Sequence, residues 1–326
     1  NQERYTKTST KSYSLNSDYF GFFPMDDEKY KIKGLERFSN KQLTQLSKDA
    51  DLLYFTDTYG IYNNEWYQKK DITERSGMLY GGLSAKDVQL ARLMKHQNKL
   101  IIAEFNTIGD PTDSAARANF EQEFAIKWTG WTARHFESLD TAVNMELPHW
   151  LINNYKKTHQ NQWPFRKAGI AFVSNDDRVV ILEDSVHLSN PMPHIQTDKT
   201  GQEKFGLPSE VRYPFWFDII EYDAKVNKSA ANFKISMNGR GLAELKSQGI
   251  PAVFPAITYH KGKDYQFYYF SGDFCDNPVS INSSYFKWIG YFKWMFYDDR
   301  NPMERRSFFW NYYRPLISTI LNEYSD

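Results

Sequence analysis

The clearest hydrophobic pattern in the chain lies at residues 84–103. Ser84 stands where a helix N-cap belongs, and Asp87 follows three residues later as its capping partner. After a polar break at residues 96–99, the apolar run LIIA at 100–103 is typical of a strand buried on both faces. The apolar residues before that break have the spacing of one helical face: Val88, Leu90, Ala91, Leu93 and Met94. We therefore expect a helix that leads into a buried strand.

Similar patterns elsewhere predict that helices and strands alternate, which is typical of a layered α/β domain. Residues 189–208 are rich in Pro, Gly and polar residues, and we expect a mobile loop or the edge of an inserted subdomain there. Helices are predicted at 39–50, 114–124, 148–157, 240–248, 283–297 and 308–324. Strands are predicted at 52–56, 169–174, 178–182, 213–221 and 233–237, with a late hairpin of 253–259 and 265–270.

Composition excludes several classes of protein and site. The 40 basic and 40 acidic residues of this 326-residue chain balance, so no global field favours nucleic acid or an anionic membrane. Cys275 is the sole cysteine, which excludes an intrachain disulfide and a thiolate-rich zinc site. The seven histidines lack metal-site spacing, and no phosphate loop or dinucleotide fingerprint is present. We expect no metal and no cofactor.

Acidic residues follow three of the predicted strands. Asp57, Glu104 and Asp273 stand at strand ends, where ligands bind in open α/β sheets. Paired carboxylates there could act as general acid and base on a glycosidic bond, or hold a divalent cation. Alternatively, they cap turns or pair with an arginine, such as Arg134 for Glu104. Tyr59 and Asn106 follow two of these strands and are candidate ligand-binding residues.

Aromatic residues make up 17% of the chain and gather in clusters, one of which is WTGWTARHF at 128–136. Trp128 and Trp131 flank a Thr-Gly turn and could stack on a sugar ring, with Arg134 holding a carboxylate or hydroxyl. The alternative is a loop held on the core by its aromatic side chains, with Arg134 paired to an acid. The sequence leaves both interpretations open.

Three pieces of the chain resemble the class I glutamine amidotransferase-like superfamily. They are GGLSAKDVQLARLMKHQNKLIIAEFN at 81–106, the strand at 51–57, and the hairpin GIPAVFPAITYHKGKDYQFYYFSGD at 249–273. The trehalose-utilisation-like proteins and the trimerisation domains of some β-galactosidases belong to that group. The resemblance implies a flavodoxin-like three-layer sandwich with a mostly parallel central sheet, a late β-hairpin and an inserted segment.

The chain departs from that superfamily at the catalytic position. Working amidotransferases need a nucleophilic Cys in a glycine-flanked elbow, but Glu104, Phe105 and Asn106 follow the central strand here. Cys275 lies elsewhere, and its nearest histidine is His260. We therefore do not expect glutamine hydrolysis. The wider string DTYGIY, YGG, AEFNT, WTGW and YPFWFD resembles bacterial proteins often anchored outside the cytoplasmic membrane.

These observations predict a single α/β domain over residues 1–326, with an insertion or subdomain over 125–240. We expect a non-catalytic, extracytoplasmic bacterial domain that recognises a glycan or a partner protein through an aromatic- and acid-lined cleft. A glycan-active hydrolase with paired carboxylates and a structural assembly domain are the alternatives, so enzyme activity stays open. The chain begins at Asn1, and we expect a processed product whose signal peptide or membrane anchor lies outside this sequence.

Overall fold

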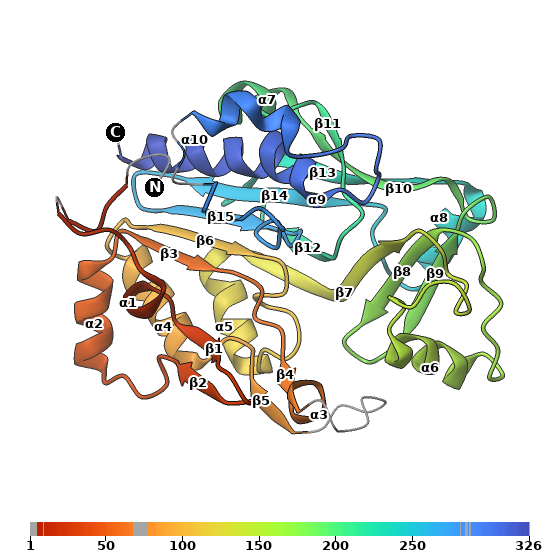
Figure 1. Cartoon of the computed structure of the whole chain (residues 1–326), viewed down its shortest axis with the longest axis horizontal. Helices are drawn as coiled ribbons and strands as arrows, with labels where there is room; N and C mark the ends of the chain where they lie inside the picture. The colour runs from red at the N-terminus through yellow and green to blue at the C-terminus, as the bar shows by residue number, and fades with distance from the viewer. Residues whose placement is uncertain are drawn as a thin grey trace.

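Seven strands form the central sheet of the protein, and helices cover both of its faces (Figure 1). The computed structural model describes residues 5–8, 10–67, 77–280, 282, 283, 286 and 288–325. The expected three-layer α/β sandwich is confirmed. In spatial order the strands are β11 (Glu210–Arg212), β10 (Leu188–Thr197), β13 (Lys228–Met237), β14 (Val253–Lys261), β15 (Gln266–Phe270), β6 (Leu100–Glu104) and β3 (Leu52–Phe55).

Strand direction follows from the pairing. β3, β6 and β15 are mutually parallel neighbours, whereas the pairs β15–β14, β14–β13, β13–β10 and β10–β11 are antiparallel. Five of the seven strands therefore run in one direction, and β14 and β10 run in the other. The β14–β15 pair is the expected late hairpin.

The central strand β6 has side chains in a separate hydrophobic core on each face of the sheet. Leu100 and Ile102 point into one core, and Ile101 and Ala103 into the other. This alternation is the two-residue period of a strand, and all five residues of β6 are buried because helices cover both faces. The helices that pack on the side of Ile101 are α2 (Asn40–Asp49), α4 (Ala85–Lys95) and α5 (Ser114–Phe124). Those on the side of Leu100 are α7 (Lys199–Phe205), α9 (Arg305–Phe308) and α10 (Arg314–Ser325).

Helix α4 begins as the sequence predicts. The Ser84 hydroxyl accepts a hydrogen bond from the Asp87 backbone N–H, and the Asp87 carboxylate accepts one from the Ser84 backbone N–H. This reciprocal capping satisfies two backbone donors at the start of the helix. It fixes where the chain enters α4 and hence where β6 begins.

A second, antiparallel sheet lies beside the first (Figure 1). Helix α6 (His149–Thr158) packs on it and forms a third core. Gly130 has a φ of +87°, and the pairing of strand β7 (Ile126–Phe136) shifts register between Trp128 and Trp131, as at a β-bulge. The sheet contains β12 (Phe217–Tyr222), β7 (Ile126–Phe136), β8 (Gly169–Ser174) and β9 (Val179–Glu183).

The predicted insertion at 125–240 supplies strands to both sheets, because β10, β11 and β13 extend the central one. The prediction of a mobile loop at 189–208 was wrong, because strand β10 and helix α7 occupy most of this range. β10 lies inside the central sheet there, and its pairing with β13 shifts register around Pro191 and Pro193, which lack an N–H for a regular ladder.

The remaining elements are short. Among the described residues, no helix combines the length and the apolar character needed to cross a bilayer. The short elements are α1 (Leu15–Asp18), β1 (Gly21–Pro24), β2 (Tyr30–Lys33), β4 (Ile61–Tyr62), α3 (Asn63–Trp66), β5 (Met78–Tyr80), α8 (Gly239–Ser247), a 3₁₀ helix (Ile289–Met295) and a π-helical turn (Phe309–Tyr313).

Candidate functional site

The three acidic residues expected at strand ends lie at one edge of the central sheet. Phe55 of β3 pairs with Ala103 of β6, and Phe270 of β15 pairs with Glu104. Because these strands are parallel, Asp57, Glu104 and Asp273 follow or end them at the same edge. Burial raises the pKa of Asp273 and of Glu104 most; the charge of Asp57 raises the first further, and the charge of Asp273 raises the second.

A fourth carboxyl group, Asp218, comes from β12 of the second sheet. Its Oδ2 accepts hydrogen bonds from the Asn106 backbone N–H at 2.7 Å and from the Tyr269 hydroxyl at 2.6 Å. Its own backbone N–H donates to the Ser271 carbonyl at 2.6 Å, which holds β12 against the end of β15. Asp218 was not among the site residues predicted from the sequence. The available signal was a charged residue inside an apolar strand, which requires a buried partner.

Asn106 connects two of these carboxyl groups. Its backbone N–H binds Asp218, and its side-chain Nδ2 donates to Asp57 Oδ1 at 3.0 Å. The residue has a φ of +60°, in the left-handed region that Asn adopts more readily than most residues. The expected ligand-binding Asn106 is therefore a buried positioning residue, with its amide already bonded to the protein.

Glu104 is fully buried, as its position inside β6 suggested, but its partner is not Arg134. Glu104 Oε2 accepts hydrogen bonds from the backbone N–H groups of Phe274 and Cys275, each at 3.1 Å. Arg134 instead pairs with Glu146 at 2.8 Å. The expected pairing was wrong because the segment after β15 folds back over the end of β6 and supplies two backbone donors.

Burial raises the pKa of every one of these carboxyl groups. The pKa of Asp57 rises to about 6, those of Asp218 and Asp273 to about 7, and that of Glu104 to about 8. Desolvation of the charged form is the main cause in each case, and mutual repulsion adds to it. The edge of the sheet therefore holds several carboxyl groups that titrate near neutral pH.

Three of the carboxyl oxygens have no hydrogen-bond partner among the described residues, namely Glu104 Oε1, Asp218 Oδ1 and Asp273 Oδ1. Positive charge nearby comes from Arg305, which pairs with Asp276 and lowers the pKa of Asp273 less than burial raises it. In the part of the chain that the structure describes, no three acidic, cysteine or histidine side chains are arranged to hold a metal ion.

The exposed rim of this acidic cluster consists of Tyr59, Asp57 and Asp276. The Tyr59 side chain is 56% exposed, and its backbone N–H donates to Asp57 Oδ1 at 2.8 Å. Burial raises the pKa of the Tyr59 hydroxyl most, and the charges of Asp57, Glu65 and Asp276 raise it further. Asp57 is partly buried and Asp276 is exposed. Glu104 and Asp218 lie further inside and are fully buried.

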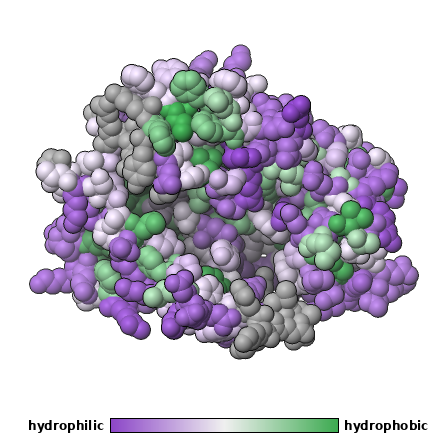
Figure 2. Space-filling view, viewed as in Figure 1, coloured by the Kyte–Doolittle hydropathy of each residue, from purple (hydrophilic) through white to green (hydrophobic). Residues whose placement is uncertain are grey.

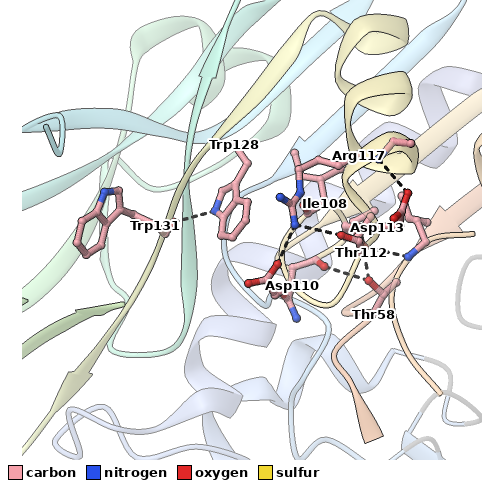
Figure 3. Close-up of polar contacts among 12 residues, drawn as sticks. Thr58, Ile108, Asp110, Thr112, Asp113, Arg117, Trp128 and Trp131 are labelled. Atoms are coloured by element: carbon pink, nitrogen blue, oxygen red, sulfur yellow. Dashed lines mark hydrogen bonds and ion pairs between the residues drawn. The ribbon is translucent and has the colours of Figure 1, made fainter. Parts of the chain in front are cut away.

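Trp128 and Trp131 are buried, so neither ring is available to stack on a sugar. They lie on the strand β7 on either side of its bulge, rather than across a loop turn. Trp128 Nε1 donates to the Trp131 carbonyl at 2.9 Å, and the guanidinium of Arg117 lies 4.7 Å from the Trp128 ring centre (Figure 3). The alternative expectation holds in part: the tryptophan side chains are buried and Arg134 is paired to an acid, but the segment is a strand and not a loop.

Arg117 of α5 holds the loop that follows β6. Its Nε donates to the Ile108 carbonyl at 2.6 Å, and its Nη2 donates to the Thr112 carbonyl at 3.1 Å and pairs with Asp110 at 2.9 Å (Figure 3). The Thr58 hydroxyl donates to the Asn106 carbonyl at 3.0 Å and ties the loop after β3 to the same segment. These bonds fix Asn106 between the two carboxyl groups.

Cys275 lies against the acidic cluster. Burial and the neighbouring Glu104 raise the pKa of its thiol far above the ordinary value. A cysteine nucleophile needs the opposite shift, toward the thiolate. Burial of Cys275 therefore disfavours a nucleophilic role for its thiol.

Two surface pockets of the described residues lie away from this edge. One is between α4 and α5, lined by Ser84, Arg92 and Asn119 among others. The other is beside β11 and is lined by residues that include His194, Arg212 and Glu304. Neither contains a residue that the sequence analysis proposed for the site. The expected aromatic- and acid-lined cleft is not one of these two pockets.

Comparison with solved structures finds a weak likeness to a β-galactosidase from Bacillus circulans sp. alkalophilus. The TM-score is 0.30 and the sequence identity is 10%, over 59% of this chain and 19% of that enzyme. The similar region therefore spans less than a fifth of the enzyme, and a likeness this low carries no functional argument. No protein-family profile matches the sequence, and no curated protein matches it either.

Proposed function

We propose that this chain is a non-catalytic recognition domain that binds a glycan at the exposed rim formed by Tyr59, Asp57 and Asp276. The observation that carries the proposal is the Tyr59 ring, which stays more than half exposed beside two carboxyl groups. An aromatic ring can pack on the apolar face of a sugar, and carboxylates accept strong hydrogen bonds from its hydroxyl groups.

Burial of the inner acids supports a non-catalytic role. A glycosidase needs two carboxyl groups that flank the scissile bond, about 5–10 Å apart across an accessible site. Glu104 and Asp218 are fully buried, and backbone or tyrosine donors already occupy one oxygen of each. Neither carboxyl group is therefore accessible to a bound glycan.

We infer from the resemblance to the class I glutamine amidotransferase-like superfamily only a similar fold. We also propose that the domain lies outside the cytoplasm. Fractionation of producing cells, with the domain detected outside the cytoplasm, tests the location. Glycan binding by the rim does not depend on the outcome of this location test.

A glycan-array measurement tests the rim directly. We expect selective binding by the wild type and at least about tenfold weaker binding by Tyr59→Ala, which corresponds to about 1.4 kcal/mol. Tyr13→Ala is the matched control, because Tyr13 is a tyrosine of similar exposure, 60%, in another part of the chain. If Tyr59→Ala binds as the wild type does, or the wild type binds no glycan, the proposal is wrong.

A glycan-active hydrolase is the second candidate, favoured by carboxyl groups with pKa values of about 6 for Asp57 and about 7 for Asp273. A raised pKa lets one carboxyl group donate a proton while another stays charged. Release of reducing ends from the bound glycans measures this activity. Turnover that is lost in both Asp57→Asn and Asp273→Asn, while the variants remain folded, would replace the non-catalytic proposal.

A further inference from the structure

The part of the chain that connects β15 to α9 in the sequence carries a run of large apolar side chains on the surface. The amphipathic helix predicted for 283–297 falls partly outside the described residues; where the structure describes this segment, it forms the 3₁₀ helix Ile289–Met295 with no buried residue. Figure 2 shows hydrophobic residues at the top of the molecule, in the region that α7 and α10 occupy in Figure 1. We define the aromatic surface as the exposed members of this run: Phe286, Trp288, Tyr291, Phe292, Trp294, Met295 and Phe296.

These side chains are exposed to an unusual degree. Tyr291 is 81% exposed, Trp294 is 68% exposed and Phe292 is 56% exposed. Monomeric soluble proteins rarely leave so many large apolar side chains of one short segment in water, because each forfeits the free energy of burial. A surface of this composition therefore indicates a binding partner.

The aromatic surface is attached to the core at its C-terminal end. The ring of Phe296 stacks on that of Trp310, with centroids 5.9 Å apart, and Trp310 is almost fully buried. The Tyr297 hydroxyl donates to Asn311 Oδ1 at 3.5 Å. Tyr291 and Trp294 therefore project from a segment that is anchored on the π-helical turn.

Charge along this segment has one sign. Residues 277–297 contain no Asp or Glu, and both of their charged residues are lysines. The next acid, Asp298, is paired with Arg300 at 3.1 Å. Trp and Tyr are enriched where a bilayer meets water, and lysines there extend toward anionic headgroups. Interfaces between proteins also favour Trp, Tyr and Phe, but they are depleted in Lys.

We propose that the aromatic surface docks this protein peripherally on a lipid bilayer that contains anionic lipids. Trp294, Phe292 and Tyr291 insert into the headgroup region, and Lys293 contacts the anionic headgroups. This proposal is independent of glycan binding, because Tyr59 and the acidic rim take no part in it.

Vesicle flotation tests the proposal. Wild-type protein is mixed with vesicles of phosphatidylcholine alone or of phosphatidylcholine with phosphatidylglycerol, and the bound fraction is measured after centrifugation. We expect binding to the anionic vesicles, at least about tenfold weaker binding by Trp294→Ser, and about fivefold weaker binding by Lys293→Glu. The matched control is Met145→Ser, since Met145 is also highly exposed but lies outside the aromatic surface.

The outcomes separate a membrane from other partners. Circular dichroism of each variant first establishes that it is folded. Flotation that depends on Trp294 and Lys293 but not on Met145 supports the proposal. Failure of the wild type to float with anionic vesicles overturns it, as does flotation unchanged by Trp294→Ser. A dimer in light scattering that Trp294→Ser dissociates assigns the surface to a second copy of the chain and equally overturns it.

Discussion

Asn106 shows how one side chain can set the geometry of an acidic site. Its amide binds Asp57 and its backbone N–H binds Asp218, in a left-handed conformation. The sequence places it after a buried strand, but only the fold brings Asp218 to it, from a strand more than a hundred residues later. Its role is therefore positional, where the sequence suggested ligand contact.

Substitution of Asn106 separates its two contributions. Asn106→Gly loses the bond to Asp57 but accommodates the positive φ, and we expect it to lower the free energy of unfolding by about 1 kcal/mol. Asn106→Ala loses the same bond and also strains the backbone, so we expect about 2 kcal/mol. Urea unfolding at pH 7 measures both. Equal losses in the two variants would contradict the role assigned to the backbone.

The raised carboxyl pKa values predict how stability depends on pH. Unfolded carboxyl groups titrate near pH 4, so at neutral pH the folded chain holds protons that the unfolded chain has released. Stability must therefore fall as pH rises toward the folded pKa of about 8 for Glu104. Burial lowers the pKa of His135 to about 4, which has the opposite effect below about pH 6.5. The test accordingly lies between pH 7 and pH 8.

We expect the free energy of unfolding to decrease from pH 7 to pH 8, by at most about 1.4 kcal/mol per pH unit for each group involved. Glu104→Gln removes the largest contributor and still accepts the bonds from Phe274 and Cys275, so its stability should decline less steeply. Urea titrations of both proteins at the two pH values give the comparison. A slope that is the same in wild type and variant would show that Glu104 does not hold the proton.

At the scale of elements, regular local patterns predicted structure well. The helix at 85–95 was predicted from its apolar spacing and N-cap, and the strand at 100–104 from its apolar run. The hairpin of β14 and β15 followed from two apolar runs around a Gly-Lys turn. Segments with prolines or bulges were predicted wrongly: a loop was expected at β10 and a turn at the Thr-Gly pair of β7, but both lie in strands. Pairing with neighbouring strands overrides local preference there.

The partners of buried groups were the part of the site that sequence could not supply. Three strand-end acids were predicted because strand ends are visible in the sequence. The backbone donors of Glu104 and the contribution of β12 depend on how two sheets meet. That arrangement is set by packing between distant segments.

Arg117 links helix α5 to the loop after β6, and this linkage can be tested. Arg117→Lys keeps the charge but loses the planar fork that reaches Ile108 and Thr112, and we expect a loss of about 2 kcal/mol in unfolding free energy. Arg92→Lys is the matched control, since Arg92 forms a more exposed pair with Glu123. We expect a change below about 0.5 kcal/mol for it. Similar losses for both would argue against a special role of the loop network.

On the scale of the whole molecule, β7 connects the hydrophobic cores. Trp128 lies in the core beneath α4 and α5, Trp131 in the core on the opposite face, and Phe136 in the core with α6. Side chains of one strand thus take part in all three. The 125–240 segment was expected to form an insertion or subdomain. Because β7 contributes side chains to all three cores, we do not expect this segment to unfold by itself.

We expect the described part of the chain to unfold in a single transition. Trp131→Ala should lower the unfolding free energy by about 3–5 kcal/mol because it empties a large volume in the largest core. It should move the fluorescence and circular dichroism transitions together. Differential scanning calorimetry on wild type and variant provides the measurement. Two resolved transitions, with only one shifted by the substitution, would mean that the smaller sheet is an autonomous unit.

The path of β7 also limits how this architecture can be cut or recombined. Excising the smaller sheet would require a breakpoint near Gly130. A cut before Trp128 would remove that side chain from the core beneath α4 and α5, and a cut between Trp128 and Trp131 would divide β7. Transplanting that sheet onto another scaffold would meet the same difficulty, since side chains of β7 are buried against residues of the larger sheet and would become exposed. Exchange of modules between relatives should therefore favour crossovers outside residues 126–136.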